Sequence, residues 1–545
     1  MAFRSSLILI LLCSFVALGA ATTSSVNARA IDLLTVGSDT DLAIVNSIIS
    51  PDGFPRSAVL AGGTFPGPLI VANKGDHFRV NVINQLTDDS MLKVTSIHWH
   101  GFFQKGSTWA DGVSFVSQCP VVPGNSFLYE FDVPDQAGSF WYHSHMSVQY
   151  CDGLRGPIVV YDPDDPYKDM YDVDDATTVI TLADWYHLSA SQLALLPPPP
   201  LPNATLINGL GRHKDGPPVP LAVVNVEYGK RYRFRVIAMS CQPSFNLSID
   251  EHDMTVIETD GEYTRPHTVS SVTVFAGQRY SVIVSATQPV NNYAIRANPS
   301  TGNSGFDGGI NMAILRYNGA SESDPDYYKE LAKDSYHLQE IDLHALVNPA
   351  APGEPHVDGA DVNINMLFDT DAVTGDFTIN GKSWYSPTIP VLLQILSGAQ
   401  SAADLIPKGS LYPLPLNKSI QLTFSPGTTA VTGPHPFHLH GHSFSVIRSA
   451  GSYEYNYVDP VRRDVVSTGA VEDNVTIRFV TDNSGPWFLH CHVDWHLNEG
   501  FAVVLAEDVA DMNSEVIPGA WKDLCPIYDS LAPEKGDGTT ADVHT

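Results

Sequence analysis

The most informative stretch of the sequence is Gly485-Pro-Trp-Phe-Leu-His490-Cys491-His492, because most of it occurs a second time. Gly138-Ser-Phe-Trp-Tyr-His143-Ser144-His145 matches it, with the glycine and both histidines in the same places. In both copies a glycine follows eight residues after the last histidine, and an apolar run comes next. A repeat at such a distance indicates domains that arose by duplication.

Two further segments extend the repeat. His98-Trp-His100-Gly matches His438-Leu-His440-Gly. A weaker copy at 247–252 matches 437–442 but lacks both aligned histidines. We therefore expect three related domains, of which the middle one lacks metal ligands. We expect the three domains to span residues 22–165, 166–336 and 337–545.

Short runs of alternating apolar and polar residues dominate the chain, and clusters of Gly, Pro, Asn and Asp separate them. Examples are 78–83, 232–236 and 475–480, which we predict to be strands. Helical patterns are rare, and the proline-rich segment 196–202 is predicted to be an exposed loop. The sequence thus predicts an all-β protein of sandwiches or barrels.

Composition and the N-terminus indicate an exported protein. The net charge is -30 at pH 7, which disfavours nucleic acid and anionic membranes as partners. Residues 1–21 have a basic residue, a short apolar run and small residues at the end, as in a signal peptide. We expect a secreted, extracellular, monomeric protein with no membrane segment. Four sequons are predicted glycosylation sites: Asn203, Asn246, Asn417 and Asn474.

Five His-x-His pairs occur, at 98/100, 143/145, 438/440, 440/442 and 490/492, where random placement of 20 histidines would give fewer than one. Residues i and i+2 of a strand share a face, so each pair can offer two imidazoles to one metal cluster. Four such strands, two from each outer domain, would supply eight imidazoles, which suit copper, zinc, iron or nickel. The alternatives are a structural zinc site or buried histidines bonded to the backbone. We interpret His442 as structural, because its aligned positions include Phe102.

Five cysteines remain after signal removal, and an odd number leaves one thiol for another role. Cys491 is the candidate, and on a strand it points away from the face of its two histidine neighbours. His435 lies three residues before His438 and His496 lies five residues after Cys491, and one cysteine with two histidines is typical of blue copper. The matching first-domain positions are Thr95 and Ser144, so only the last domain can build this site. The alternatives are an inert buried thiol and a disulfide partner.

These motifs together resemble the multicopper oxidases, and in detail the fungal laccases. The resemblance rests on four segments that span most of the chain: 98–112, 141–156, 435–442 and 485–496. It implies three cupredoxin-like Greek-key domains and four copper ions. It assigns the blue type 1 copper to His435, Cys491 and His496, and type 2 to His98 and His438. The implied ligands of the type 3 pair are His100, His143, His145, His440, His490 and His492.

The resemblance also implies an axial position at type 1 copper, occupied here by Phe501, which cannot ligate. Without a thioether there, a high reduction potential is expected. The implied disulfides are Cys119–Cys525 and Cys151–Cys241. Gln242 stands where many relatives carry a substrate-binding carboxylate, and it cannot accept a proton at ordinary pH.

The implied activity is one-electron oxidation of small phenols beside His496, coupled to reduction of dioxygen to water. Asp111 and Asp494 are candidate carboxylates for proton supply, with ordinary structural bonding as the alternative. The physiological donor, whether lignin, a pigment precursor or a small phenol, stays open. The alternative functions are a related oxidase of ferrous iron and a copper-binding electron carrier without catalysis.

Overall fold

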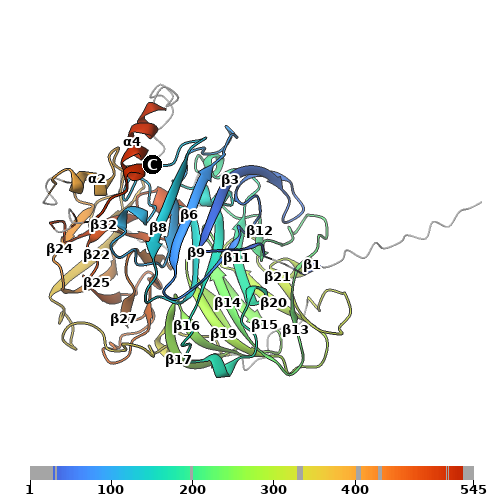
Figure 1. Ribbon diagram of the computed structural model, residues 1–545. Coiled ribbons are helices and arrows are strands. Elements are labelled where there is room, and N and C mark those ends of the chain that lie inside the picture. The colour runs from blue at the N-terminus through green and yellow to red at the C-terminus, as the bar shows by residue number, and fades with distance from the viewer. Residues whose placement is uncertain are drawn as a thin grey trace, which may run out of the picture.

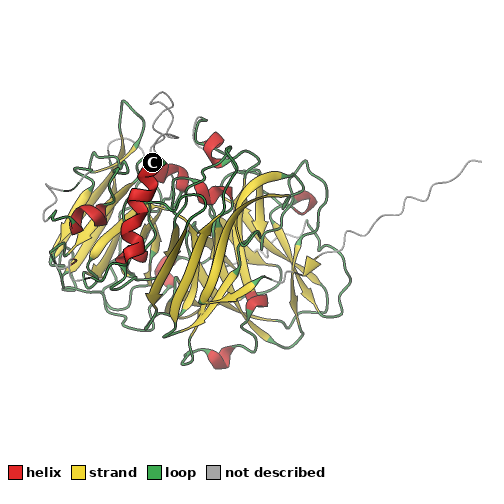
Figure 2. Ribbon diagram, turned by 45° about the horizontal axis from the view of Figure 1, so that its top comes forward, coloured by secondary structure: helices red, strands yellow, loops and turns green. Residues whose placement is uncertain are grey.

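The computed structural model describes residues 29–531, except for 31–32, 197–199, 328–335, 400–404, 406, 428–432, 511 and 513–514. The expected signal peptide and the centre of the proline-rich segment therefore lie outside the described residues. Strands dominate the fold and form six sheets, while the helices are short and lie between or around them (Figure 2). The predicted all-β class is confirmed.

The first two sheets come from the N-terminal part of the chain (Figure 1). One has the order β4-β3-β6-β8 and the other β2-β5-β10-β9-β7. The elements are β2 Thr35–Gly37, β3 Asp39–Ile49, β4 Arg56–Ala61, β5 Leu69–Asn73, β6 His77–Asn84, β7 Ile97–His100, η1 Thr108–Ala110, β8 Ser126–Asp132, β9 Gly138–Ser144, η2 Gln149–Asp152 and β10 Arg155–Tyr161. In β6, the alternation of exposed and buried residues follows the sequence pattern that predicted a strand at 78–83.

The middle pair of sheets has the orders β1-β13-β21-β20-β15-β18 and β12-β11-β14-β19-β16-β17. The elements are β1 Arg29–Ala30, η3 Lys168–Met170, η4 Ala176–Thr178, β11 Val179–Trp185, α1 Ala190–Leu193, β12 Ala204–Ile207, β13 Ala222–Val226, β14 Arg231–Ala238, β15 Phe245–Ile249, β16 Met254–Thr259, β17 Glu262–Val269, β18 Ser271–Val274, β19 Arg279–Ser285, β20 Asn292–Pro299, η5 Asp307–Gly309, β21 Met312–Tyr317 and η6 Glu340–Asp342. β14 contains the predicted strand at 232–236. Residues 29–30 fall within the bounds predicted for the first domain, but the strand that they form, β1, pairs with β13 of this middle sheet.

The last pair has the orders β23-β22-β25-β30-β27-β28 and β24-β32-β31-β26-β29. The elements are β22 Val362–Thr370, β23 Phe377–Ile379, α2 Val391–Leu396, β24 Leu411–Leu414, β25 Ser419–Pro426, β26 Pro436–Leu439, β27 Phe444–Arg448, β28 Arg462–Arg463, β29 Val465–Ser467, β30 Val475–Val480, β31 Gly485–Cys491, α3 Asp494–Asn498, β32 Ala502–Glu507 and α4 Gly519–Ser530. β30 coincides with the predicted strand at 475–480. We call the three pairs the first, middle and last domains.

The strand ladders confirm the internal repeat. β7 pairs with β9 so that His98 lies opposite His143, and β26 pairs with β31 so that His438 lies opposite His490. In the middle domain the same ladder joins β15 to β20. There Arg296 lies opposite Ser248 and its guanidinium binds the carboxylate of Asp250. An ion pair thus occupies the place that histidines hold in the outer domains.

The outer domains share one apolar core. Phe78 and Trp99 of the first domain belong to the same buried cluster as Trp384, Phe488 and Trp521 from the last part of the chain. Strand ends that carry histidines therefore meet at an interface that is packed and shielded from water.

The structure forms both disulfides that the resemblance implied. Cys525 on α4 is bonded to Cys119 of the first domain. Cys151 of the first domain is bonded to Cys241 of the middle domain. Among the described helices, none has the length and apolar character needed to cross a membrane.

Candidate metal centres

Eight histidines from four strand ends gather between the first and last domains. Their potential ligand atoms form three groups, two of which share His100, and within each group all atoms lie within 4.8 Å of one another. All eight residues are buried. The groups are His98, His100 and His438; His100, His143 and His492; and His145, His440 and His490.

Backbone carbonyls determine which nitrogen of four imidazoles faces the centre. Nδ1 of His98 donates to the carbonyl of Asp111 at 2.7 Å, and Nδ1 of His438 donates to the carbonyl of Asp464 at 2.9 Å. Nδ1 of His143 and of His490 each lies 2.9 Å from the carbonyl of the following residue. A neutral imidazole that donates through Nδ1 presents a lone pair at Nε2. Nε2 atoms buried without a hydrogen-bond partner among the described residues include those of His98, His143, His145 and His438.

Carboxylates determine the orientation of two further imidazoles. Nδ1 of His440 donates to Oδ2 of Asp111 at 3.0 Å, and Nε2 of His100 donates to Oδ1 of Asp464 at 3.2 Å. Nε2 of His440 then lies 3.1 Å from Nε2 of His490. Since both Nδ1 atoms are already donors, two lone pairs face each other at this distance. A cation between the two nitrogens removes that repulsion.

The same arrangement occurs on the other side of the centre, where Nδ1 of His100 lies 3.2 Å from Nε2 of His492. Burial lowers the pKa of the following imidazoles, to about 3 for His490: His100, His143, His145, His438, His440, His490 and His492. They are therefore neutral, which is the form that binds metals. The donor set fits several copper-like ions held by imidazole.

A second donor set lies on the opposite face of β31. Sγ of Cys491 is 3.7 Å from Nδ1 of His435 and 3.6 Å from Nδ1 of His496, and these two nitrogens are 3.1 Å apart. Cys491 is the one cysteine of the described chain outside a disulfide. Burial raises the pKa of its thiol, so the thiolate requires a cation beside it. One thiolate with two imidazoles fits a blue-copper site.

Two aromatic side chains pack against the histidines of this second donor set. Phe501 is fully buried, and its ring lies 5.1 Å from that of His435. Phe377 stacks on Phe501 at 4.7 Å and lies 4.7 Å from the ring of His496. The sequence indicated Phe501 but not Phe377, which lies 58 residues before His435 and carries no local pattern. The predicted axial position is apolar.

Gln242 is connected to this set through two intermediate side chains, Tyr186 and Trp495. Its Oε1 is 3.4 Å from the hydroxyl of Tyr186, which accepts a hydrogen bond from Nε1 of Trp495 at 3.3 Å. Trp495 directly precedes His496. Asp184 beneath it accepts hydrogen bonds from the N–H groups of Cys241 and Gln242. A role of Gln242 in substrate binding stays a prediction.

The two candidate proton-supply residues lie in different surroundings. Asp111 is in direct contact with two clustered imidazoles, as described above. Asp494 lines a cavity of about 40 Å³ together with His145, Ser114 and Ser147. Burial raises the pKa of the Asp494 carboxyl well above its usual value. Both residues are thus beside the histidine cluster, while their part in proton supply stays a prediction.

A second carboxyl pair lies at the outer rim of the cysteine site. Glu499 ends α3, and its carbonyl accepts the N–H of Phe377 at 2.9 Å. Burial, followed by the charge of Asp376, raises the pKa of Glu499 to about 7. Asp376 itself accepts a hydrogen bond from the Tyr385 hydroxyl at 2.6 Å. Sequence reasoning did not single out this pair.

Two other histidines of the repeat stay outside the metal-like groups. Nδ1 of His442 lies 3.3 Å from the carbonyl of His440, and Nε2 lies 3.1 Å from Glu507. His252 of the middle domain bonds to the Asp250 carbonyl and to the Tyr317 hydroxyl. His442 fits the structural role that we expected for it.

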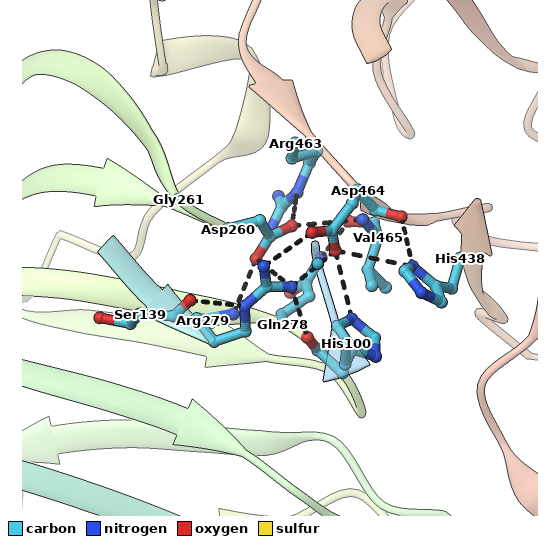
Figure 3. A network of polar contacts seen from close by, with 12 residues as sticks. His100, Ser139, Asp260, Gly261, Gln278, Arg279, His438, Arg463, Asp464 and Val465 are labelled. Atoms are coloured by element: carbon cyan, nitrogen blue, oxygen red, sulfur yellow. Dashed lines mark hydrogen bonds and ion pairs between the residues drawn. The ribbon is translucent and has the colours of Figure 1, made fainter. Parts of the chain in front are cut away.

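Asp464 is the main polar residue that sequence reasoning missed. It orients His438 through its carbonyl and His100 through its carboxylate, and Arg279 of the middle domain binds that carboxylate (Figure 3). A single aspartate between Arg463 and Val465 carries no pattern that would reveal this position.

Comparisons with known proteins agree with the two donor sets. Three family models, each described as multicopper oxidase, match residues 43–165, 176–320 and 384–511. Laccase-4 of Trametes villosa is 58% identical over 498 residues, which cover 91% of this chain and 95% of that protein. The crystal structure of a laccase from Botrytis aclada has a TM-score of 0.81 at 29% identity and covers 94% of this chain and 96% of that chain.

The structure of Fet3p, a multicopper oxidase that functions in iron import, has a TM-score of 0.79 at 26% identity. The match covers 91% of this chain and 95% of that chain. Both the identity to curated laccases and the three family models extend over most of the sequence. The chain therefore belongs to the multicopper oxidase family, and within it to the laccases.

Proposed function

We propose that this oxidoreductase binds four copper ions and couples the one-electron oxidation of small phenols to the reduction of dioxygen to water. One observation carries the proposal: Cys491, at the end of β31, faces His435 and His496, while its neighbours His490 and His492 belong to the eight-histidine cluster on the other side. The two sets are joined by the backbone on either side of Cys491. Bound copper would supply single-electron transfer at the first set and reduction of dioxygen at the second.

The ligand assignments follow the donor sets. His435, Cys491 and His496 would hold the mononuclear type 1 ion, and His98 and His438 the type 2 ion. The type 3 pair would be held by His100, His143, His145, His440, His490 and His492. This assignment is supported by the lone pairs that converge from these residues.

His496 is the proposed site of substrate contact. It is the one ligand of the cysteine set that is partly exposed, whereas His435 and Cys491 are buried. A phenol can therefore approach the imidazole edge without entering the core. The amide of Gln242, which reaches this edge through Tyr186 and Trp495, can orient a phenolic hydroxyl by hydrogen bonding.

Protons for dioxygen reduction must reach a cluster that is closed to bulk water. Asp494 is suited to hold a proton, because burial raises its pKa, and it lines a cavity with His145. Asp111 is suited to keep His440 in the correct tautomer. We propose Asp494 as a proton donor and Asp111 as an orienting residue beside the cluster.

Oxidation of ferrous iron is the competing reaction, because Fet3p is among the similar structures. Asp376 and Glu499 lie near the His496 rim, where a cation could bind. However, Tyr385 already donates to Asp376, and the raised pKa of Glu499 keeps that carboxyl protonated in acid. The identity to laccases favours phenols as the electron donors.

We also propose that the protein is secreted, glycosylated and monomeric. Asn246 and Asn417 are exposed, and Asn203 and Asn474 are partly exposed, so a glycan can reach each of them. A shift in mass after enzymatic deglycosylation of the exported protein would test their use.

The central test is metal analysis of purified native protein combined with absorption and spin-resonance spectra. We expect four copper ions per chain and faster oxygen uptake with a methoxyphenol than with ferrous ion. Cys491→Ser should lose the blue colour and oxidase activity while the protein stays soluble. His252→Asn, a change of a buried histidine in the middle domain, is the control and should keep both. Native protein that holds zinc would contradict the proposal.

A further inference from the structure

We propose that the middle domain, although it contributes no residue to the metal-like groups of the described chain, completes the histidine cluster and sets its affinity for copper. The segment 277–279 performs this role, with Arg279 as a positioning residue. The inference rests on the proposed copper assignment of the cluster.

Arg279 connects all three domains from a fully buried position. Its Nη1 and Nη2 each donate to one carboxylate oxygen of Asp464 in the last domain, both at 2.6 Å. Its Nε donates to the carbonyl of Ser139 in the first domain at 2.9 Å. Figure 3 shows the guanidinium between these two partners. A fork of this kind holds a carboxylate in one orientation.

Asp464 transmits that orientation to two imidazoles of different strands. Its Oδ1 accepts from Nε2 of His100 at 3.2 Å, and its carbonyl accepts from Nδ1 of His438 at 2.9 Å. The two rings are stacked, with centroids 3.8 Å apart and planes 12° from parallel. One aspartate, through its carboxylate and its carbonyl, therefore aligns a ligand from each outer domain.

Asp260, also of the middle domain, links Arg279 to a second buried arginine, Arg463. Its Oδ1 accepts the N–H of Arg279 at 2.7 Å, and its Oδ2 accepts Nε of Arg463 at 3.0 Å. Arg463 also forms an ion pair with Glu340 at 2.6 Å. Because every buried charge here has an opposite partner, removal of Arg279 alone would leave Asp464 without its main counter-charge.

Gly277 brings the same segment against the imidazoles themselves. Its φ is +84°, and a Cβ at this position would lie 2.8 Å from Cδ2 of His492 and 3.1 Å from Cε1 of His100. Nε2 of the adjacent Gln278 donates to the carbonyl of Val465 at 3.1 Å. The segment 277–279 thus packs directly against the imidazoles of the cluster, and it also holds their hydrogen-bonding partner Asp464 in place.

Partners that orient ligand imidazoles typically change metal affinity by about 10–100-fold when mutated. We expect Arg279→Gln to weaken copper retention by the cluster by about this factor. The blue site should be unaffected, because its ligands lie on the opposite face of β31.

The test compares holoproteins dialysed against increasing concentrations of a copper chelator. The type 2 spin-resonance signal reports the cluster, and blue absorption reports the cysteine site. Arg296→Gln is the matched control, since Arg296 forms a buried bidentate pair with Asp250 in the same domain, at 2.7 and 2.9 Å. Selective loss of the type 2 signal in Arg279→Gln supports the inference. Equal retention in both variants, or parallel loss of the blue band, overturns it.

A second pair of variants decides the matter if Arg279→Gln is not recovered folded. Gly277→Ala and Gly229→Ala place a side chain at similar φ values, +84° and +89°, but only Gly277 has atoms within 4 Å of the added Cβ. We expect an altered type 2 signal in Gly277→Ala alone, and identical spectra in both would refute the inference. Native protein without copper would instead refute the proposed function.

Discussion

Glu499→Gln should make the protein less sensitive to rising pH. The side chain has a pKa of about 7 in the folded protein, against an ordinary value of 4.5, because burial and Asp376 disfavour its charge. The folded state therefore holds this proton more tightly than the unfolded chain. The resulting stabilisation is fully present below pH 4.5 and is lost as the pH rises through about 7.

The size of the effect follows from the shift. A change from 4.5 to about 7 corresponds to about 3 kcal/mol. The side chain is partly exposed, so solvent screening reduces the free-energy difference to roughly 1–2 kcal/mol. We expect the native protein to lose this amount relative to Glu499→Gln between pH 4.5 and pH 8.

The assay is urea unfolding of both proteins at these two pH values. Glu454→Gln, which removes a carboxylate from an exposed position, is the control and should follow the native protein. If the free energy of unfolding had the same pH dependence in the native protein and in Glu499→Gln, the reasoning about this carboxyl pair would be wrong.

Three further predictions concern the metal sites and the disulfides. Phe501→Met should lower the reduction potential of the cysteine site, because it offers a thioether at the axial position. Redox titration of the blue band measures this potential, and an unchanged value would contradict the axial assignment. Replacement of both Cys119 and Cys525 by Ser removes a cross-link over 406 residues and should lower the free energy of unfolding by about 3–5 kcal/mol. Denaturant titration measures this loss, and a loss below about 1 kcal/mol would show that α4 docks without the disulfide. Removal of copper by a chelator should lower the unfolding temperature in calorimetry and restored copper should raise it again, whereas an unchanged temperature would mean that the sites contribute nothing to stability.

Local patterns were sufficient to predict much of the architecture. Alternation identified the strands at 78–83, 232–236 and 475–480, and the repeated His-x-His pairs indicated which strands meet. They did not indicate the nitrogen that each imidazole presents. His100 and His440 occupy equivalent positions of the repeat, yet His100 bonds to its carboxylate through Nε2 and His440 through Nδ1.

Residues that act across domains could not be found from one sequence. Arg279 and Asp464 are separated by 185 residues, and neither belongs to a repeated motif. Phe377 reaches His496 through the tertiary fold alone. The pairing of β1 with the middle domain likewise depends on a long-range contact that a two-residue segment cannot reveal.

The placement of the last ligands determines when the enzyme can be assembled. His490, Cys491, His492 and His496 lie close to the end of the chain, and α4, which follows them, is bonded back to Cys119. During synthesis the first and middle domains can fold before these residues leave the ribosome. At that stage each histidine strand of the first domain is an incomplete chelator, so the complete ligand sets form only once the last domain has folded against the first.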